Sequence, residues 1–216
     1  MKRKLPSYYP VFLSINGKKC VVVGGGQVAL RKVKVLLDYG ADVKVISPDL
    51  CPELNRLAED RKIDVQRKLY QPGDLKGALI VIAATDEHAI NLEVVKEAKG
   101  TGILVNVVDD PGNSDFIVPS CLRRGDITVA VSTAGRSPAL ARKIRSRMEK
   151  DLGNEYAVLV QLIDEVRMEI KSRGIKVNSE DWQKALDLDL LIDLLKKNDR
   201  ERARNQLLEN LTASQK

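Results

Sequence analysis

Three carboxylates lie close together in the segment NVVDDPGNSDF, namely Asp109, Asp110 and Asp115. The segment follows an apolar run at 103–108. A carboxylate held next to a substrate can take up a proton as a bond to hydrogen breaks. The chain has one histidine, His88, and we expect it to be an exposed helix residue. Acid–base chemistry therefore falls to a carboxylate or a lysine, and one of the three aspartates is the predicted general base.

A second stretch whose residues could bind a ligand is the glycine-rich CVVVGGGQVALRK. Gly24, Gly26 and Ala29 form the pattern G-x-G-x-x-A between a β-branched run at 19–24 and a helical pattern from about residue 27 to 39. In that setting Gly24 permits a tight turn, Gly26 allows a pyrophosphate to approach the backbone, and Ala29 lets helix and strand pack closely. The free N–H groups at the helix start then bind phosphate charge. The pattern predicts a dinucleotide site.

The next expected strand, at 41–47, ends in Ser47, where a dinucleotide site usually carries an acid for the ribose hydroxyls. Asp49 follows two positions later and could reach the ribose 2′-OH from the loop. The alternative is that Asp49 caps the following helix. No arginine stands next to it to hold a 2′-phosphate, so the sequence favours NAD over NADP.

A third polar loop, AATDEHAIN, follows an apolar run at 78–85. Thr85 and Asp86 either contact the ligand directly or cap the next helix. Since ligands of parallel sheets bind at the carboxyl ends of strands, this loop belongs to the same predicted site.

These segments are positioned by strands that alternate with helices, which indicates an α/β fold with a doubly wound, Rossmann-type parallel sheet. The apolar runs at 21–23 and 79–84 are nearly continuous, as expected for strands covered on both faces. A small α+β segment follows, in which 127–132 is a strand and Ser137-Pro138 starts a helix. Helical patterns begin at Asn154 and near Ser179, and Gly174 ends the first. We therefore expect three parts: an NAD-binding domain at 1–113, a dimerisation and substrate segment at 114–150, and a helical domain at 151–216.

The charge of the chain is concentrated in one segment. The formal net charge is +6, and residues 121–150 hold eight basic and two acidic residues. Such a segment attracts a polyanion, or else it forms a solvated helix face. It contains no aromatic residue to stack on bases, which argues against nucleic-acid binding.

Composition excludes several other classes. Cys20, Cys51 and Cys121 are odd in number and widely spaced, so we expect reduced, partly buried thiols rather than disulfides or a metal site. No resident metal is predicted. The sequence has no apolar run of signal-peptide or membrane-span length, and we expect a cytoplasmic protein without membrane contact.

Four blocks of the sequence resemble the precorrin-2 dehydrogenase family, which includes sirohydrochlorin ferrochelatases and the N-terminal module of sirohaem synthases. They are YPVFLSINGKKCVVVGGGQVALRK, IAATDEHAIN, NVVDDPGNSDFIVPS and ITVAVSTAGRSPALARKIR, in family order over roughly residues 8–150. The resemblance implies NAD-dependent oxidation of precorrin-2, a tetrapyrrole with eight carboxylates, to sirohydrochlorin. It implies a homodimer formed through the basic segment, so that part of the basic surface could serve the interface.

The resemblance also assigns roles to particular residues. It makes Asp109 the catalytic aspartate, and Arg136 and Asn106 are predicted to contact the substrate. The predicted cofactor contacts are Gly24, Gly26, Gln27, Val28, Pro48, Asp49 and Thr85.

Three questions stay open at this level. Some relatives also insert Fe²⁺ into sirohydrochlorin and others do not, and the sequence does not separate the two kinds. Relatives with an AVSS motif carry a phosphorylatable serine where this chain has Thr133. The alternative function is an NAD-sensing regulatory module of a transport system, which also pairs a glycine turn with an ATDD-like loop but usually keeps an acid at the position of Ser47.

Overall fold

The computed structural model describes residues 8–213 and divides the chain into two compact units, Met1–Val118 and Pro119–Lys216. The predicted NAD-binding segment lies within the first unit. The predicted segment 114–150 falls mostly in the second unit, together with the helical region.

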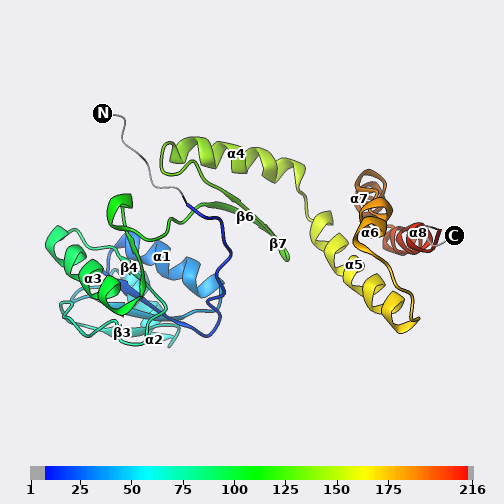
Figure 1. The fold of residues 1–216 in the computed structure, drawn as a ribbon. Coiled ribbons are helices and arrows are strands. Elements are labelled where there is room, and N and C mark those ends of the chain that lie inside the picture. Colours follow the sequence, from blue (N-terminus) through cyan, green and yellow to red (C-terminus); the bar gives the residue numbers. More distant parts are fainter. Residues whose placement is uncertain (1–7, 214–216) are drawn as a thin grey trace. The chain divides into compact units, whose positions relative to one another are not determined.

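The first unit is built on a five-stranded parallel sheet in the order β3-β2-β1-β4-β5 (Figure 1). Its strands are β1 (Lys19–Val23), β2 (Asp42–Ile46), β3 (Asp64–Gln66), β4 (Ile80–Ala83) and β5 (Leu104–Val107). Between them run α1 (Gln27–Asp38), α2 (Pro52–Glu59) and α3 (His88–Thr101), and the short 3₁₀ helix η1 (Pro111–Asn113) follows β5. The predicted doubly wound α/β fold is confirmed.

Both faces of the sheet are covered, which explains why β4 and the residues of β1 after Lys19 are apolar at every position. In β1, Cys20 and Val22 pack with the buried residues of α1 and α2, whereas Val21 and Val23 pack with those of α3. Successive side chains of a strand point to opposite faces, so a strand buried on both sides must be apolar at every position.

No helix forms between β3 and β4, where the chain runs through turns at 67–79. Tyr70 and Leu75 from this connection are buried in the same cluster as α3. These two side chains cover the part of the sheet that a crossover helix would otherwise cover.

The strand order places the loops that matter for function. The chain winds outward from β1 to β2 and β3 on one side, then returns to form β4 and β5 on the other. The strand order therefore reverses between β1 and β4, and a crevice opens at the carboxyl ends of the strands at such a point.

The second unit combines a β-ribbon with helices. β6 (Ser120–Arg124) pairs antiparallel with β7 (Ile127–Val131), and α4 (Pro138–Asp151) packs against both. The Oγ of Ser137 accepts a hydrogen bond of 3.1 Å from the Leu140 N–H, which confirms the predicted helix start. The remaining helices, α5 (Glu155–Ser172), α6 (Ser179–Ala185), α7 (Leu188–Lys196) and α8 (Arg200–Ala213), share an apolar core.

All three cysteines are free, as expected, but they differ in exposure. Cys20 is buried in β1, and burial raises the pKa of its thiol to about 11. Cys51 is half-buried and Cys121 is exposed, so the expectation of partial burial is wrong for Cys121. Among residues 8–213, no helix is both long and apolar enough to cross a membrane.

Candidate functional site

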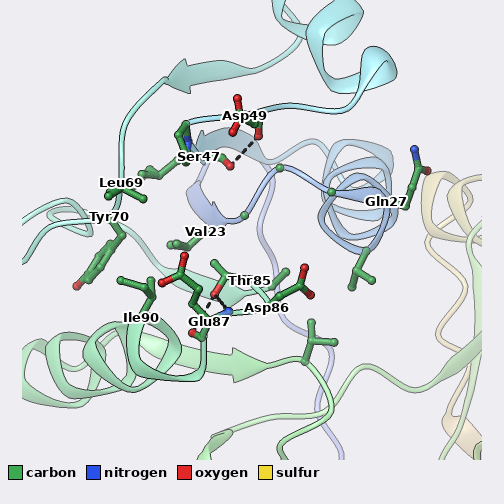
Figure 2. Close-up of a pocket in the computed structure, with 18 of the residues that line it drawn as sticks. Val23, Gln27, Ser47, Asp49, Leu69, Tyr70, Thr85, Asp86, Glu87 and Ile90 are labelled. Atoms are coloured by element: carbon green, nitrogen blue, oxygen red, sulfur yellow. Dashed lines mark hydrogen bonds between the residues drawn. The ribbon is translucent and has the colours of Figure 1, made fainter.

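A cavity of about 520 Å³ lies at the carboxyl edge of the sheet in the first unit (Figure 2). Its walls come from the loops after all five strands. The structure brings together in it all seven predicted cofactor contacts and the predicted catalytic residue: Gly24, Gly26, Gln27, Val28, Pro48, Asp49, Thr85 and Asp109.

The three consecutive glycines after β1 meet three different demands. Gly24 has a φ of +127°, and a Cβ on it would overlap the Ala84 carbonyl of the neighbouring loop. A Cβ on Gly25 would overlap the Asp49 carbonyl oxygen, so this glycine lets the loop after β2 pack against the turn. A Cβ on Gly26 would meet no atom within 4 Å. The space beside Gly26 is therefore open, as the approach of a pyrophosphate requires.

The start of α1 fits an anionic ligand. Its N-cap is Gly26, which has no side chain to accept hydrogen bonds from the first turn, and the first turn contains no acidic residue. The N–H groups of a helix start carry partial positive charge. A phosphate at this place would complete the hydrogen bonding of the helix end.

The loop after β2 is tied to the glycine turn. The Ser47 hydroxyl donates to the Asp49 carbonyl at 2.7 Å, and the Cys51 N–H donates to the Gly25 carbonyl at 2.8 Å. The N-cap of α2 is Cys51, so the alternative that Asp49 caps this helix is wrong. The Asp49 side chain is exposed and lines the cavity, where Figure 2 shows it beside Ser47.

The loop after β4 serves both the helix and the cavity. The Thr85 Oγ accepts from the Glu87 N–H at 3.2 Å, while Thr85 and Asn91 are joined through the Thr85 hydroxyl and the Asn91 side-chain amide. Asn91 is buried, so this contact fixes the loop on α3. The N-cap of α3 is Glu87 and no side chain in the described part of the chain caps this helix, so the alternative that Thr85 or Asp86 caps it is wrong. Both residues line the cavity.

The structure separates the three aspartates of the loop after β5. Asp110 accepts hydrogen bonds from Asn113, which hold the pKa of its carboxyl below the usual range. The Asp115 carboxylate accepts from the Val105 N–H at 3.0 Å and so fixes the chain against β5. Of these three residues, all in the described part of the chain, Asp109 is the one that lines the cavity.

Asp109 also has an unusual backbone. Its φ is +59°, in the left-handed region that residues other than glycine seldom adopt. Such conformations cost free energy and are found where a side chain must take a set direction. Here the turn places an exposed carboxylate at the cavity, directly after a buried strand.

Lys32 of α1 supplies a nearby positive charge. It lies one helical turn after Val28, on the same side of the helix, and Val28 lines the cavity. Burial lowers the pKa of Lys32, and the adjacent charge of Arg31 adds to this effect, whereas the Asp109 carboxylate raises it. Asp109 therefore has a half-buried ammonium within electrostatic range.

The two predicted substrate contacts do not line this cavity. Asn106 is buried in β5, and its side-chain amide donates to the Phe116 carbonyl at 2.9 Å, which is a structural contact. Arg136 is exposed in the second unit, in the turn between β7 and α4. Their predicted contacts with substrate stay predictions.

Sequence reasoning missed the cavity wall formed by Lys68, Leu69 and Tyr70. β3 ends at Gln66, so these three residues follow the carboxyl end of a strand, where ligands of parallel sheets bind. Among the residues described, no group of three or more histidines, cysteines or carboxylates is placed to hold a metal ion.

Comparison with known families places these features in context. Residues 11–120 match the family model described as NAD(P)-binding, which spans the whole sheet and cavity. The chain belongs to this NAD(P)-binding family. Residues 124–150 match a second model, the central part of sirohaem biosynthesis proteins. The family resemblance of the sequence blocks is thereby confirmed.

Proteins that are similar to this chain in sequence or structure lead to the same family. The siroheme synthase of Nitrosococcus oceani is 44% identical over 181 residues, and siroheme synthase 1 of Aeromonas salmonicida is 38% identical over 210 residues. These alignments cover 83% and 96% of this chain but only 39% and 45% of the relatives, so the chain spans less than half of their length. The solved structure of SirC, a precorrin-2 dehydrogenase, matches 95% of this chain and 100% of its own, with a TM-score of 0.69 and 25% identity.

Proposed function

We propose that the chain catalyses the NAD-dependent dehydrogenation of precorrin-2 to sirohydrochlorin, a step of sirohaem biosynthesis. The observation that carries the proposal is the placement of Asp109 in the same cavity as the open glycine turn. The match to SirC over its whole length supports the reaction, because that protein is a precorrin-2 dehydrogenase.

The cavity has the groups that NAD⁺ requires. The turn at Gly24–Gly26 and the start of α1 would hold the pyrophosphate, and the Asp49 carboxylate would accept hydrogen bonds from the adenosine ribose. Thr85 would contact the cofactor between its two halves. When bound, NAD⁺ supplies the acceptor for a hydride.

Asp109 is the proposed general base. Loss of a hydride from a carbon of the reduced macrocycle leaves a cation, which becomes neutral when a proton leaves an adjacent position. The Asp109 carboxylate receives that proton. The half-buried Lys32 ammonium lies within electrostatic range of this carboxylate.

The basic segment is the proposed contact for the substrate carboxylates. In α4 the side chains of Arg142, Lys143, Arg147 and Lys150 are exposed, and Arg136 precedes the helix. Glu149, one of the two acids of the segment, is paired with Arg145 at 2.7 Å and with Arg124 at 3.5 Å. The Arg124–Glu149 pair joins β6 to α4 and the Arg145–Glu149 pair lies within α4, so part of the positive charge is structural, and the rest is available to a polyanion.

A homodimer is also proposed. Leu140 and Ile144 lie one turn apart on α4, and both are exposed, at 51% and 39%. Apolar side chains on one helix face are typical of a contact surface. Light scattering on the purified protein should give twice the chain mass, and Leu140→Glu should reduce it to one chain mass.

The reaction is tested with anaerobically prepared precorrin-2 and NAD⁺. We expect the absorbance of NADH to increase at a rate proportional to protein concentration. The spectrum of sirohydrochlorin should appear at the same time. Binding of NAD⁺ without turnover would instead support the alternative, an NAD-sensing regulatory module. A second assay with sirohydrochlorin and Fe²⁺ shows whether metal insertion accompanies the dehydrogenation.

A further inference from the structure

The loop after β3 closes one end of the cavity. The cavity-lining segments follow the strand order along the sheet edge: Lys68–Tyr70 after β3, Asp49 after β2, the glycine turn after β1, Thr85 after β4 and Asp109 after β5. With the pyrophosphate at the central turn and the reaction at Asp109, the adenosine half of the cofactor extends toward β2 and β3. The loop after β3 therefore faces the adenosine.

This loop is held in place by one acidic side chain of α3. Glu97 accepts hydrogen bonds from the Tyr70 hydroxyl, from the Gly73 N–H at 2.9 Å and from the Leu75 N–H at 3.1 Å. Tyr70 and Leu75 are buried beneath it. Because three donors converge on one carboxylate, the loop is a fixed wall of the cavity.

The wall presents an apolar surface to the cavity. Leu69 is 60% exposed although it is a large apolar residue, and it lines the cavity together with Ile90 of α3. Leu69, Tyr70 and Ile90 lie on the same side of the view in Figure 2, away from Gln27. A flat, weakly polar ring such as adenine fits between such side chains.

The same loop also neutralises the charge of Lys68, which directly precedes Leu69 in the sequence. Among the described residues that line the cavity, Lys68 is the one with a cationic side chain. Its ammonium is bound by the Asp74 carboxylate at 2.7 Å, and Asp74 is fixed in turn by the Gln71 N–H at 2.8 Å. The neighbouring Arg67 does not line the cavity and donates to the Asn55 side chain at 2.7 Å.

We propose that the Lys68–Asp74 pair sets the choice of dinucleotide: Asp74 withholds the Lys68 ammonium from a 2′-phosphate, and the adenosine end therefore accepts NAD⁺ in preference to NADP⁺. A 2′-phosphate needs a cation to offset its charge, and it would also approach the Asp49 carboxylate. The 2′-hydroxyl of NAD⁺ needs only the acceptor that Asp49 provides. This inference rests on the cofactor role of the cavity in the proposed function.

The test measures the affinity for each dinucleotide by titration calorimetry at fixed low salt, without the tetrapyrrole. Asp74→Asn removes the charge and keeps an acceptor for the Gln71 N–H. The expected result is NADP⁺ binding about fivefold tighter relative to NAD⁺, the size of a modest ion pair at a partly exposed site. Adding Lys68→Met to this variant should abolish the gain.

Asp64→Asn is the matched control. It makes the same change of net charge at the other end of β3, where Asp64 is paired with Lys44 at 3.9 Å and does not line the cavity. This variant should leave the NADP⁺ to NAD⁺ ratio unchanged. The inference would be overturned if Asp74→Asn changed the affinity for both dinucleotides equally or changed neither. It would also be overturned if the control showed the same gain in NADP⁺ affinity.

The two proposals fail in different ways. Wild-type protein that binds NAD⁺ but does not oxidise precorrin-2 contradicts the proposed reaction, while the dinucleotide ratios still decide the role of Asp74. Turnover of precorrin-2 with a ratio insensitive to Asp74 overturns the inference alone.

Discussion

Asn113 donates two hydrogen bonds to the carboxylate of Asp110, one from its backbone N–H at 3.3 Å and one from its side-chain amide at 2.7 Å. Asp110 also serves as the N-cap of η1. This contact shapes the turn in which the preceding residue, Asp109, takes its left-handed conformation and lines the cavity. Adjacent carboxylates thus have separate tasks, one in structure and one at the site.

Because Asp109 and Asp110 have different tasks, the same substitution to Asn should have different effects at the two positions. Asp109→Asn removes the proposed base and should lower kcat by about 10² to 10⁴. Asp110→Asn keeps an acceptor for Asn113 and should retain most of the activity. Steady-state kinetics with precorrin-2, with NAD⁺ binding as a control for folding, measure both. A larger loss in Asp110→Asn than in Asp109→Asn would contradict the assignment.

The Asp110–Asn113 contact also predicts a pH dependence of stability. The hydrogen bond from the Asn113 side chain is the main reason that the pKa of Asp110 is below its ordinary value. A carboxylate with a lowered folded-state pKa stabilises the fold fully above its unfolded value of about 4, and this contribution is lost as the pH falls through the folded value. Urea unfolding should therefore show wild type more stable than Asp110→Asn at pH 7, with the difference decreasing below about pH 4. A difference that grows on acidification would contradict this.

Two glycine substitutions separate a packing role from a ligand role. Gly26→Ala adds a methyl group where no atom lies within 4 Å, so the melting temperature should stay near that of wild type. The affinity for NAD⁺ should still fall by about tenfold or more, because the methyl group would occupy the approach of the pyrophosphate.

Gly25→Ala is the counterpart. Its methyl group would overlap the Asp49 carbonyl, so the free energy of unfolding should fall by about 1–3 kcal/mol, as for other overpacked sites. Equal stability of the two variants, measured by thermal and urea unfolding, would show that the turn is not packed as described.

The basic segment predicts a change in substrate affinity. Arg136→Ala should raise the KM for precorrin-2 by about tenfold and leave NAD⁺ affinity unchanged, because a charge-assisted hydrogen bond to a carboxylate is lost. Lys184→Ala in α6 is the control, since it removes the same charge from an exposed position outside residues 121–150. An equal rise in both variants would indicate a nonspecific charge effect.

The sheet could be predicted from the sequence because local and tertiary preferences agree there. The runs around Val22 and Ile82 are apolar at every position, as strands covered on both faces must be, and the turn at Gly24 marks the end of the first strand. By contrast β6 was not predicted. Its sequence SCLRR has a single buried residue, Leu122, and it becomes a strand because it pairs with β7.

The site could be predicted only in part. The residues near the glycine turn follow a motif, whereas the wall at Leu69 depends on contacts between Tyr70 and Glu97 that lie far apart in the sequence. Likewise, residue type and spacing alone do not distinguish Asp109 from Asp115, and only the family resemblance selects Asp109. In the structure the distinction comes from the hydrogen bond between Asp115 and Val105, ten residues away.

The most direct test of the central claim is the stoichiometry of a single anaerobic turnover. Protein in excess is mixed with precorrin-2 and NAD⁺, and NADH and sirohydrochlorin are measured in the same sample. We expect equal amounts of the two products in wild type and, within the time that wild type needs for this turnover, neither product in Asp109→Asn, which should still bind NAD⁺. Sirohydrochlorin formed without NADH, or equal turnover by Asp109→Asn, would contradict the central claim.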